Sequence, residues 1–73
     1  MDAMTLGARV RELRVDRGLT LAVLAARAGI SVSYLNDIEH DRTVPTLGRL
    51  RNLASCLELS VRDLFLGVTP YDD

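Results

Sequence analysis

Residues 20–39, TLAVLAARAGISVSYLNDIE, carry the clearest sign of the fold in this chain. This stretch predicts a short helix, a tight turn at Gly29 and a second helix. Glycine suits such a turn because it readily adopts the left-handed backbone that three- to four-residue turns use. The small side chain of Ala25 allows the two helices to cross closely. The apolar positions at helical spacing are Leu21, Leu24 and Ala28 in the first helix and Ile30, Leu35 and Ile38 in the second.

The second of these helices also carries side chains that a protein core would not absorb. They are Val32, Ser33, Tyr34, Asn36 and Asp37. A packed first helix followed by a helix with a polar leading face is expected when the first supports the second, which is held out to touch something. The stretch therefore indicates a helix-turn-helix motif.

Length and composition favour one small domain in a reducing, cytoplasmic setting. The chain has 73 residues, of which 48% are hydrophobic, and no apolar run approaches the ~20 residues of a membrane span. Residues 1–5 contain no basic group and precede no signal-like apolar region. Cys56 is the single cysteine and His40 the single histidine, so we expect neither a disulfide nor a metal site, and no cofactor.

The charge balance is close to neutral. The whole chain carries a net charge of −1, which argues weakly against nucleic-acid binding. Between residues 5 and 66, however, nine arginines face seven acids, a balance of +2. The exclusive use of arginine suits phosphate and guanine contacts, but GC-rich codon usage explains it more simply. Charge alone therefore does not settle the partner.

The flanking sequence predicts three more helices and no strand. The first is expected over Thr5–Arg17, the fourth from Leu47 to Leu57 after the break at Pro45, and the fifth over Val61–Leu66. Thr20, Ser31 and Ser60 stand where helix N-caps are expected, the last with Asp63 in a capping-box spacing. We predict an all-α domain over residues 5–66, an N-terminal tail over 1–4, and a C-terminal tail or stub of a removed domain over 67–73.

The chain from Leu19 to Phe65, with Arg11–Arg14 before it, resembles the Cro/C1-type (Xre) helix-turn-helix family. The matching positions are Leu19-Thr20, Leu24-Ala25, Gly29-Ile30-Ser31, Tyr34-Leu35, Ile38-Glu39, Pro45-Thr46-Leu47, Leu50, Leu53-Ala54, Leu57 and Ser60 through Leu64. The resemblance implies a five-helix lambda-repressor-like domain that binds double-stranded DNA sequence-specifically and regulates transcription. The ending LSVRDLFLGVTPY also resembles short repressors of bacterial DNA-damage or radiation responses.

The resemblance assigns a role to each position of the recognition helix. It implies base contacts in the major groove from Val32, Ser33, Tyr34 and Asp37. The chemistry fits, because Val32 can contact a thymine methyl and Asp37 can accept from a cytosine amino group. Two alternatives stay open: Asp37 as a surface acid or partner of a nearby arginine, and Tyr34 as half core with its hydroxyl at a phosphate.

Contacts to DNA phosphates are expected from groups around that helix. The resemblance implies Arg42 and Thr43, which match family positions that approach the DNA backbone. Asn36 can do the same from the side of the helix, and free amides at the N-termini of the second helix, at Thr20, and of the fourth can hold phosphate oxygens. One position departs from the family, which often has a phosphate-binding Gln where this chain has Leu21. The remaining candidates are expected to be solvated surface residues: Arg9, Arg17 and Arg27.

Arg14 and Glu39 are expected to have a structural role. In similar proteins these positions form a largely buried ion pair between the first and third helices. An unpaired buried charge is costly, so each needs the other. His40 is expected to cap the third helix or face solvent, and Cys56 to be a small core or subcore residue.

Reading a palindromic operator requires two copies of the chain, with recognition helices about 34 Å apart. The fifth helix and its flanks offer more apolar surface than so short a helix can bury. We therefore predict a homodimer contact at Leu59, Val61, Leu64, Phe65 and Leu66, to which Tyr71 can add.

Two other function classes compete with DNA binding. A small autoregulatory controller or antitoxin-type protein would act partly through protein–protein contacts, which the low net charge favours slightly. An enzyme would need a paired-carboxylate cleft, an activated nucleophile or a phosphate-cradling glycine loop, and the sequence has no such pattern. We therefore expect a nucleoid-associated DNA-binding regulator, a repressor rather than an activator, and no catalysis.

Overall fold

The computed structural model describes residues 4–68 and places five α-helices in them. They are α1 (Leu6–Asp16), α2 (Leu21–Ala28), α3 (Val32–Glu39), α4 (Leu47–Cys56) and α5 (Val61–Leu64). The prediction of five helices is confirmed. The first, fourth and fifth are shorter than predicted, because Thr5, Arg17, Leu57 and Phe65 are capping residues and Leu66 follows the last cap. Tyr71 and most of both predicted tails lie outside the described residues.

Each helix begins at a serine or threonine whose side chain accepts a backbone N–H from three residues further on. The five N-caps are Thr5, Thr20, Ser31, Thr46 and Ser60. Such caps satisfy amide groups that the helix itself leaves unpaired. At Ser60 the reciprocal bond from the backbone N–H to the Asp63 carboxylate completes the capping box. A local cap residue therefore specifies where each of these helices begins.

The turn of the motif is formed as predicted. Gly29 has φ of 69°, in the left-handed region, and ends α2. Its N–H donates to the Ala26 carbonyl and that of Ile30 to the Ala25 carbonyl. The bonds close the last turn of α2 and redirect the chain into α3.

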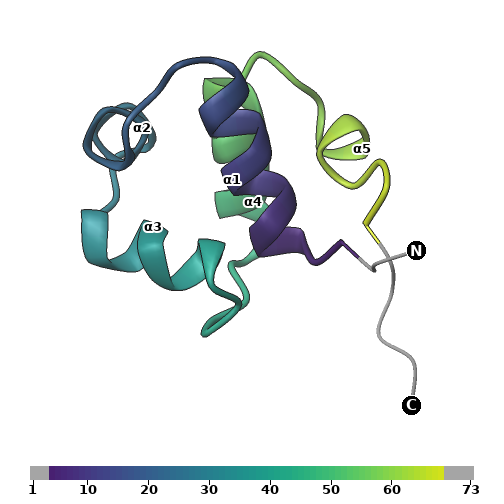
Figure 1. Cartoon of the computed structure of the whole chain (residues 1–73), viewed down its shortest axis with the longest axis horizontal. Helices are drawn as coiled ribbons and strands as arrows, with labels where there is room; N and C mark the ends of the chain where they lie inside the picture. The colour runs from purple at the N-terminus through teal and green to yellow at the C-terminus, as the bar shows by residue number, and fades with distance from the viewer. Residues whose placement is uncertain (1–3, 69–73) are drawn as a thin grey trace.

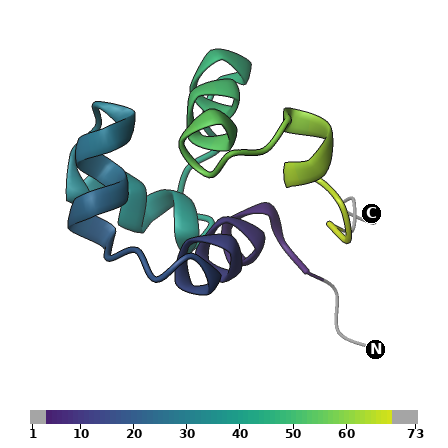
Figure 2. The same cartoon turned by 90° about the horizontal axis from the view of Figure 1, so that it is seen from above.

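The helices surround one apolar core. In Figures 1 and 2, α1 and α4 lie centrally, with α2 and α3 on one side and α5 on the other. Helix α3 packs against α1 and α2, whereas α5 packs against α1 and α4. The largest fully buried side chains are Leu24, Leu35, Ile38, Leu53, Leu57, Leu64 and Val10. Helix α3 thus buries one face and leaves the other outside the core.

Two polar side chains bind backbone carbonyl groups at the C-terminal ends of other helices. The Asn52 amide on α4 donates to the Ala28 carbonyl at the end of α2, at 2.6 Å. The Arg9 guanidinium on α1 donates to the Asp63 and Leu64 carbonyls of α5, at 3.1 and 3.4 Å. Arg9 was expected to be solvated, but its side chain is only 17% exposed because it reaches the end of α5.

The two ends of the described chain meet. Met4 and Val68 form an isolated parallel bridge, although both were predicted to lie in separate tails. None of the helices in residues 4–68 is long and apolar enough to cross a membrane.

Candidate nucleic-acid interface

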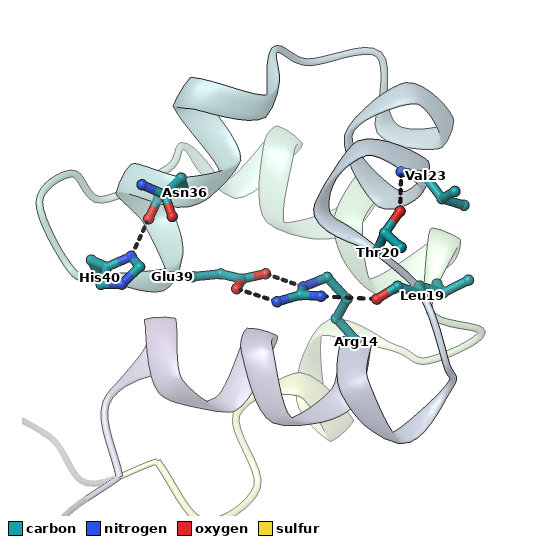
Figure 3. A network of polar contacts seen from close by, with 7 residues as sticks. All are labelled: Arg14, Leu19, Thr20, Val23, Asn36, Glu39 and His40. Atoms are coloured by element: carbon teal, nitrogen blue, oxygen red, sulfur yellow. Dashed lines mark hydrogen bonds and ion pairs between the residues drawn. The ribbon is translucent and has the colours of Figure 1, made fainter.

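A buried ion pair fixes α3 against α1. Arg14 donates through Nε to Glu39 Oε2 at 2.8 Å and through Nη2 to Oε1 at 3.0 Å (Figure 3). The side chains are 11% and 1% exposed, and Arg14 Nη1 also donates to the Leu19 carbonyl at 2.8 Å. The two parallel bonds set orientation as well as distance. Arg14 therefore ties the end of α3 to both α1 and the loop before α2.

A second link between these helices was missed by sequence reasoning. Asp41, in the loop after α3, accepts from the Thr5 hydroxyl at 2.6 Å and from the Gly7 N–H at 3.0 Å. Asp41 has φ of 59°, a conformation that aspartate tolerates better than most residues. The one sequence signal for this link is that Asp41 stands one residue beyond the C-cap of α3. Glycine or asparagine is usual at that position, and aspartate is not.

The leading turn of α3 is exposed, as its polar pattern predicted. Val32 is 46% exposed, and Ser33 also lies in solvent. The N-cap Ser31 accepts the Tyr34 N–H at 3.0 Å, so this turn is held in place while its outer side chains stay accessible. Val32 and Ser33 thus place an apolar and a hydroxyl side chain at consecutive exposed positions of α3.

Tyr34 belongs partly to the core and partly to this face. Its side chain is half-buried and packs against the core cluster. The Arg49 guanidinium carbon, from α4, lies 5.2 Å from the centre of its ring. This distance suits a cation–π contact, which holds the ring between α3 and α4.

The outer side of α3 carries a charged pair. Arg42 Nη1 donates to Asp37 Oδ1 at 3.2 Å, with side-chain exposures of 59% and 42%. Thr43 follows Arg42 and is half-buried. One alternative for Asp37, pairing with a neighbouring arginine, is thus present in this structure.

A shallow depression of about 440 Å³ lies where α1, α2 and α3 meet. Arg11, Arg14, Asn36 and His40 supply polar groups at its walls, and the full lining also includes Ala8, Leu21 and Glu39. His40 Nδ1 donates to the Asn36 carbonyl at 2.8 Å, which fixes the ring at the end of α3 (Figure 3). Sequence reasoning did not assign Arg11 to any site, because its neighbours come from other elements.

The first turn of α2 borders this region. Thr20 is exposed, and its Oγ1 accepts the Val23 N–H at 3.1 Å, which leaves its hydroxyl proton available (Figure 3). Leu21, beside it, packs against the core. No group of three or more metal-ligating side chains gathers within residues 4–68.

The apolar surface predicted around the fifth helix is only partly exposed. Phe65 and Leu66 are 40% and 58% exposed, and Leu59 and Val61 are half-buried. Leu64 is fully buried. Its inclusion in a dimer surface was wrong, because α5 turns this side chain into the core.

Five helices with an exposed α3 braced by α1 and α2 define a lambda-repressor-like helix-turn-helix domain. The chain belongs to the family described as "Helix-turn-helix domain", whose sequence profile matches residues 5–65. It is 50% identical over 70 residues to the HTH-type transcriptional regulator DdrOP3 of Deinococcus deserti, covering 96% of this chain and 54% of that protein. The chain thus spans about half of that relative's length.

Solved structures agree with this assignment. The DNA-binding domain of the P22 c2 repressor superimposes with a TM-score of 0.85 at 25% identity, covering 99% of this chain and 96% of that one. SinR in complex with DNA, a regulator of biofilm formation, gives a TM-score of 0.78 at 34% identity, covering 84% and 98%.

Proposed function

We propose that this chain binds double-stranded DNA by inserting the leading turn of α3 into the major groove. The carrying observation is that α3 is fixed by the buried Arg14–Glu39 pair while its first turn stays exposed. A recognition helix must be held rigidly, because base contacts depend on position. The DNA complex of SinR supports the proposal through its similarity to this chain.

Base recognition is assigned to four side chains on or beside that turn. Val32 provides an apolar contact for a thymine methyl, and Ser33 donates or accepts at a base edge. Asp37, one turn later, accepts from a cytosine amino group. Tyr34, whose ring contacts Arg49, uses its hydroxyl at a base or a phosphate.

Phosphate contacts are assigned to the groups that surround α3. Arg42, Thr43 and Asn36 lie on or after it, and Thr20 presents its hydroxyl from the start of α2. Leu21 cannot donate a hydrogen bond, but Arg11 at the same depression supplies a charged donor. We infer that Arg11 partly replaces the phosphate contact that a glutamine at position 21 would make.

The operator is proposed to be a palindrome bound by two copies of the chain. One recognition helix reads only a few base pairs, so a two-fold pair gains specificity from a second half-site. Phe65 and Leu66 are the exposed apolar residues at the end of α5. They form the proposed self-contact, with Leu59 and Val61 at its margin.

Repression is the proposed outcome. Occupying promoter DNA suffices to block transcription, whereas activation requires a further surface for polymerase. The P22 c2 repressor, whose DNA-binding domain has a matching fold, supports this choice.

Selection of bound duplexes from a random DNA pool tests the proposal. We expect an enriched palindrome with half-sites about one helical turn apart, bound less tightly as salt rises. The Ser33→Ala variant should shift the enriched sequence, while Arg27→Gln, on the exposed side of α2, should leave it unchanged. A pool that stays flat at low salt would contradict DNA binding.

A further inference from the structure

The Asp37–Arg42 pair occupies the face proposed to meet DNA. Arg42 Nη1 and Asp37 Oδ1 are 3.2 Å apart, and both side chains are well exposed. The two groups have opposite natural partners on a duplex, since a guanidinium binds phosphates and a carboxylate accepts from a cytosine amino group. While they bind one another, neither is fully available to DNA.

The backbone keeps this pair in register. The Arg42 N–H donates to the Asp37 carbonyl at 2.9 Å, and the Asp41 N–H donates to the Ile38 carbonyl at 3.1 Å. The Asp41 carboxylate in turn binds Thr5 and Gly7 at the start of α1. The turn after α3 is therefore tied on two sides, and it returns Arg42 to the side of α3 that carries Asp37.

The alternative partners differ in what they leave behind. If Arg42 moves to a phosphate where no cytosine faces Asp37, the carboxylate stays unpaired beside the negatively charged backbone. If a cytosine amino group is present, Asp37 exchanges one partner for another and remains satisfied. An unsatisfied charge near phosphates is unfavourable, so the first case binds less tightly.

We propose that Asp37 and Arg42 are a partner-exchange pair through which Asp37 discriminates against DNA lacking a cytosine at its position. In the free protein Asp37 binds Arg42. On a non-specific duplex Asp37 therefore competes with the phosphates for Arg42 and weakens binding. On the operator both groups change partners together. This inference rests on the proposed DNA-binding function and assigns Asp37 as its specificity-determining residue.

A double-mutant cycle with Asp37→Asn and Arg42→Gln tests the exchange. Dissociation constants are measured for the selected operator, for the operator with the cytosine pair replaced, and for a scrambled duplex, each at several salt concentrations. Asp37→Asn should tighten scrambled-duplex binding by about two- to fivefold with Arg42 present, and by less in the Arg42→Gln background. It should also reduce the preference for the cytosine pair by about fivefold or more.

Arg42→Gln should lower the slope of log affinity against log salt by about one, as expected for one lost phosphate contact. Glu58→Gln serves as the matched charge control. Glu58 is exposed in the α4–α5 loop, and its carboxylate has no ion pair among residues 4–68. Its replacement removes the same charge, so any effect should be equal with Arg42 present and in the Arg42→Gln background.

The results separate this inference from the function on which it rests. Equal gains from Asp37→Asn with and without the Arg42→Gln change would overturn the exchange, as would an unchanged cytosine preference. Wild-type protein that selects an operator and shows salt-dependent binding keeps the proposed function in either case. Wild-type protein that binds no duplex overturns both proposals.

Discussion

The Asp41 carboxylate accepts the Gly7 N–H at 3.0 Å, and this bond joins the loop after α3 to the first turn of α1. Gly7 makes the approach possible because it has no side chain. A Cβ atom at this position would lie 2.7 Å from the Glu39 carbonyl oxygen and would also overlap the Ile38 carbonyl oxygen. The end of α3 is thus seated directly on the backbone of α1.

Replacing Gly7 by alanine should therefore force the two helices apart. The atoms that the new methyl group meets are mainly backbone, which cannot rotate away, so we expect a loss of about 1–3 kcal/mol in the free energy of unfolding. Gly48→Ala on α4 is the matched control, since nothing lies within 4 Å of its Cβ position. It should add about 0.4–1 kcal/mol. Urea denaturation measures both, and a stabilised Gly7→Ala would contradict the close contact.

Asp41 contributes both hydrogen bonds and an unfavourable backbone conformation. Asp41→Ala removes the bonds to Thr5 and Gly7 but keeps a side chain at positive φ, so it should lose about 1–3 kcal/mol of stability. Asp41→Gly should lose about 1 kcal/mol less, because glycine adopts this conformation freely. Thermal unfolding compares the two. Equal losses would mean that the positive φ has no energetic weight.

The two acids of α3 should differ sharply in their effect on stability. Glu39→Ala leaves Arg14 without its buried partner, for which about 3–5 kcal/mol is expected. Asp37→Ala breaks only an exposed pair and should change stability by less than about 1 kcal/mol. Thermal melts of the two variants at one pH suffice. The reverse order would refute the structural role of Glu39.

The helices and the ion pair were predictable because each has a local or a pairwise cause. Apolar spacing and N-cap residues mark where helices begin, and Gly29 marks the turn. Arg14 and Glu39 were paired from the resemblance, supported by the cost of leaving a buried charge alone.

Asp41, Asn52 and Arg11 were not predictable in the same way. Asp41 and Asn52 act on backbone groups of other helices, at Gly7 and Ala28, and backbone groups leave no mark in the sequence. Arg11 gains its place only when α1 and α3 form a common depression. Leu64 was misassigned for a related reason, because apolar residues on a short helix do not reveal which side faces the core.

Leu21 offers a test of the phosphate contacts. Leu21→Gln introduces a donor at the start of α2, so we expect about two- to tenfold tighter binding to the selected operator. It should also lower the stability of the fold, because Leu21 packs against the core. Titrations at fixed salt, alongside urea denaturation, measure both effects. Leu19→Gln is the control, since it loses similar packing without a place at the start of α2, and equal gains in affinity would contradict a local contact.

The proposed self-contact predicts an effect that depends on the number of half-sites. Leu66→Ser removes an apolar side chain that is 58% exposed, and a two-fold contact loses it twice. Binding to a palindromic duplex should weaken about tenfold or more, because burying one leucine contributes about 1.5–3 kcal/mol. Binding to a single half-site should not change. Val15→Ser, which removes a side chain 54% exposed on α1, should alter neither. Gel shifts on the two duplexes provide the measurement, and equal weakening on both would place Leu66 outside any contact between copies.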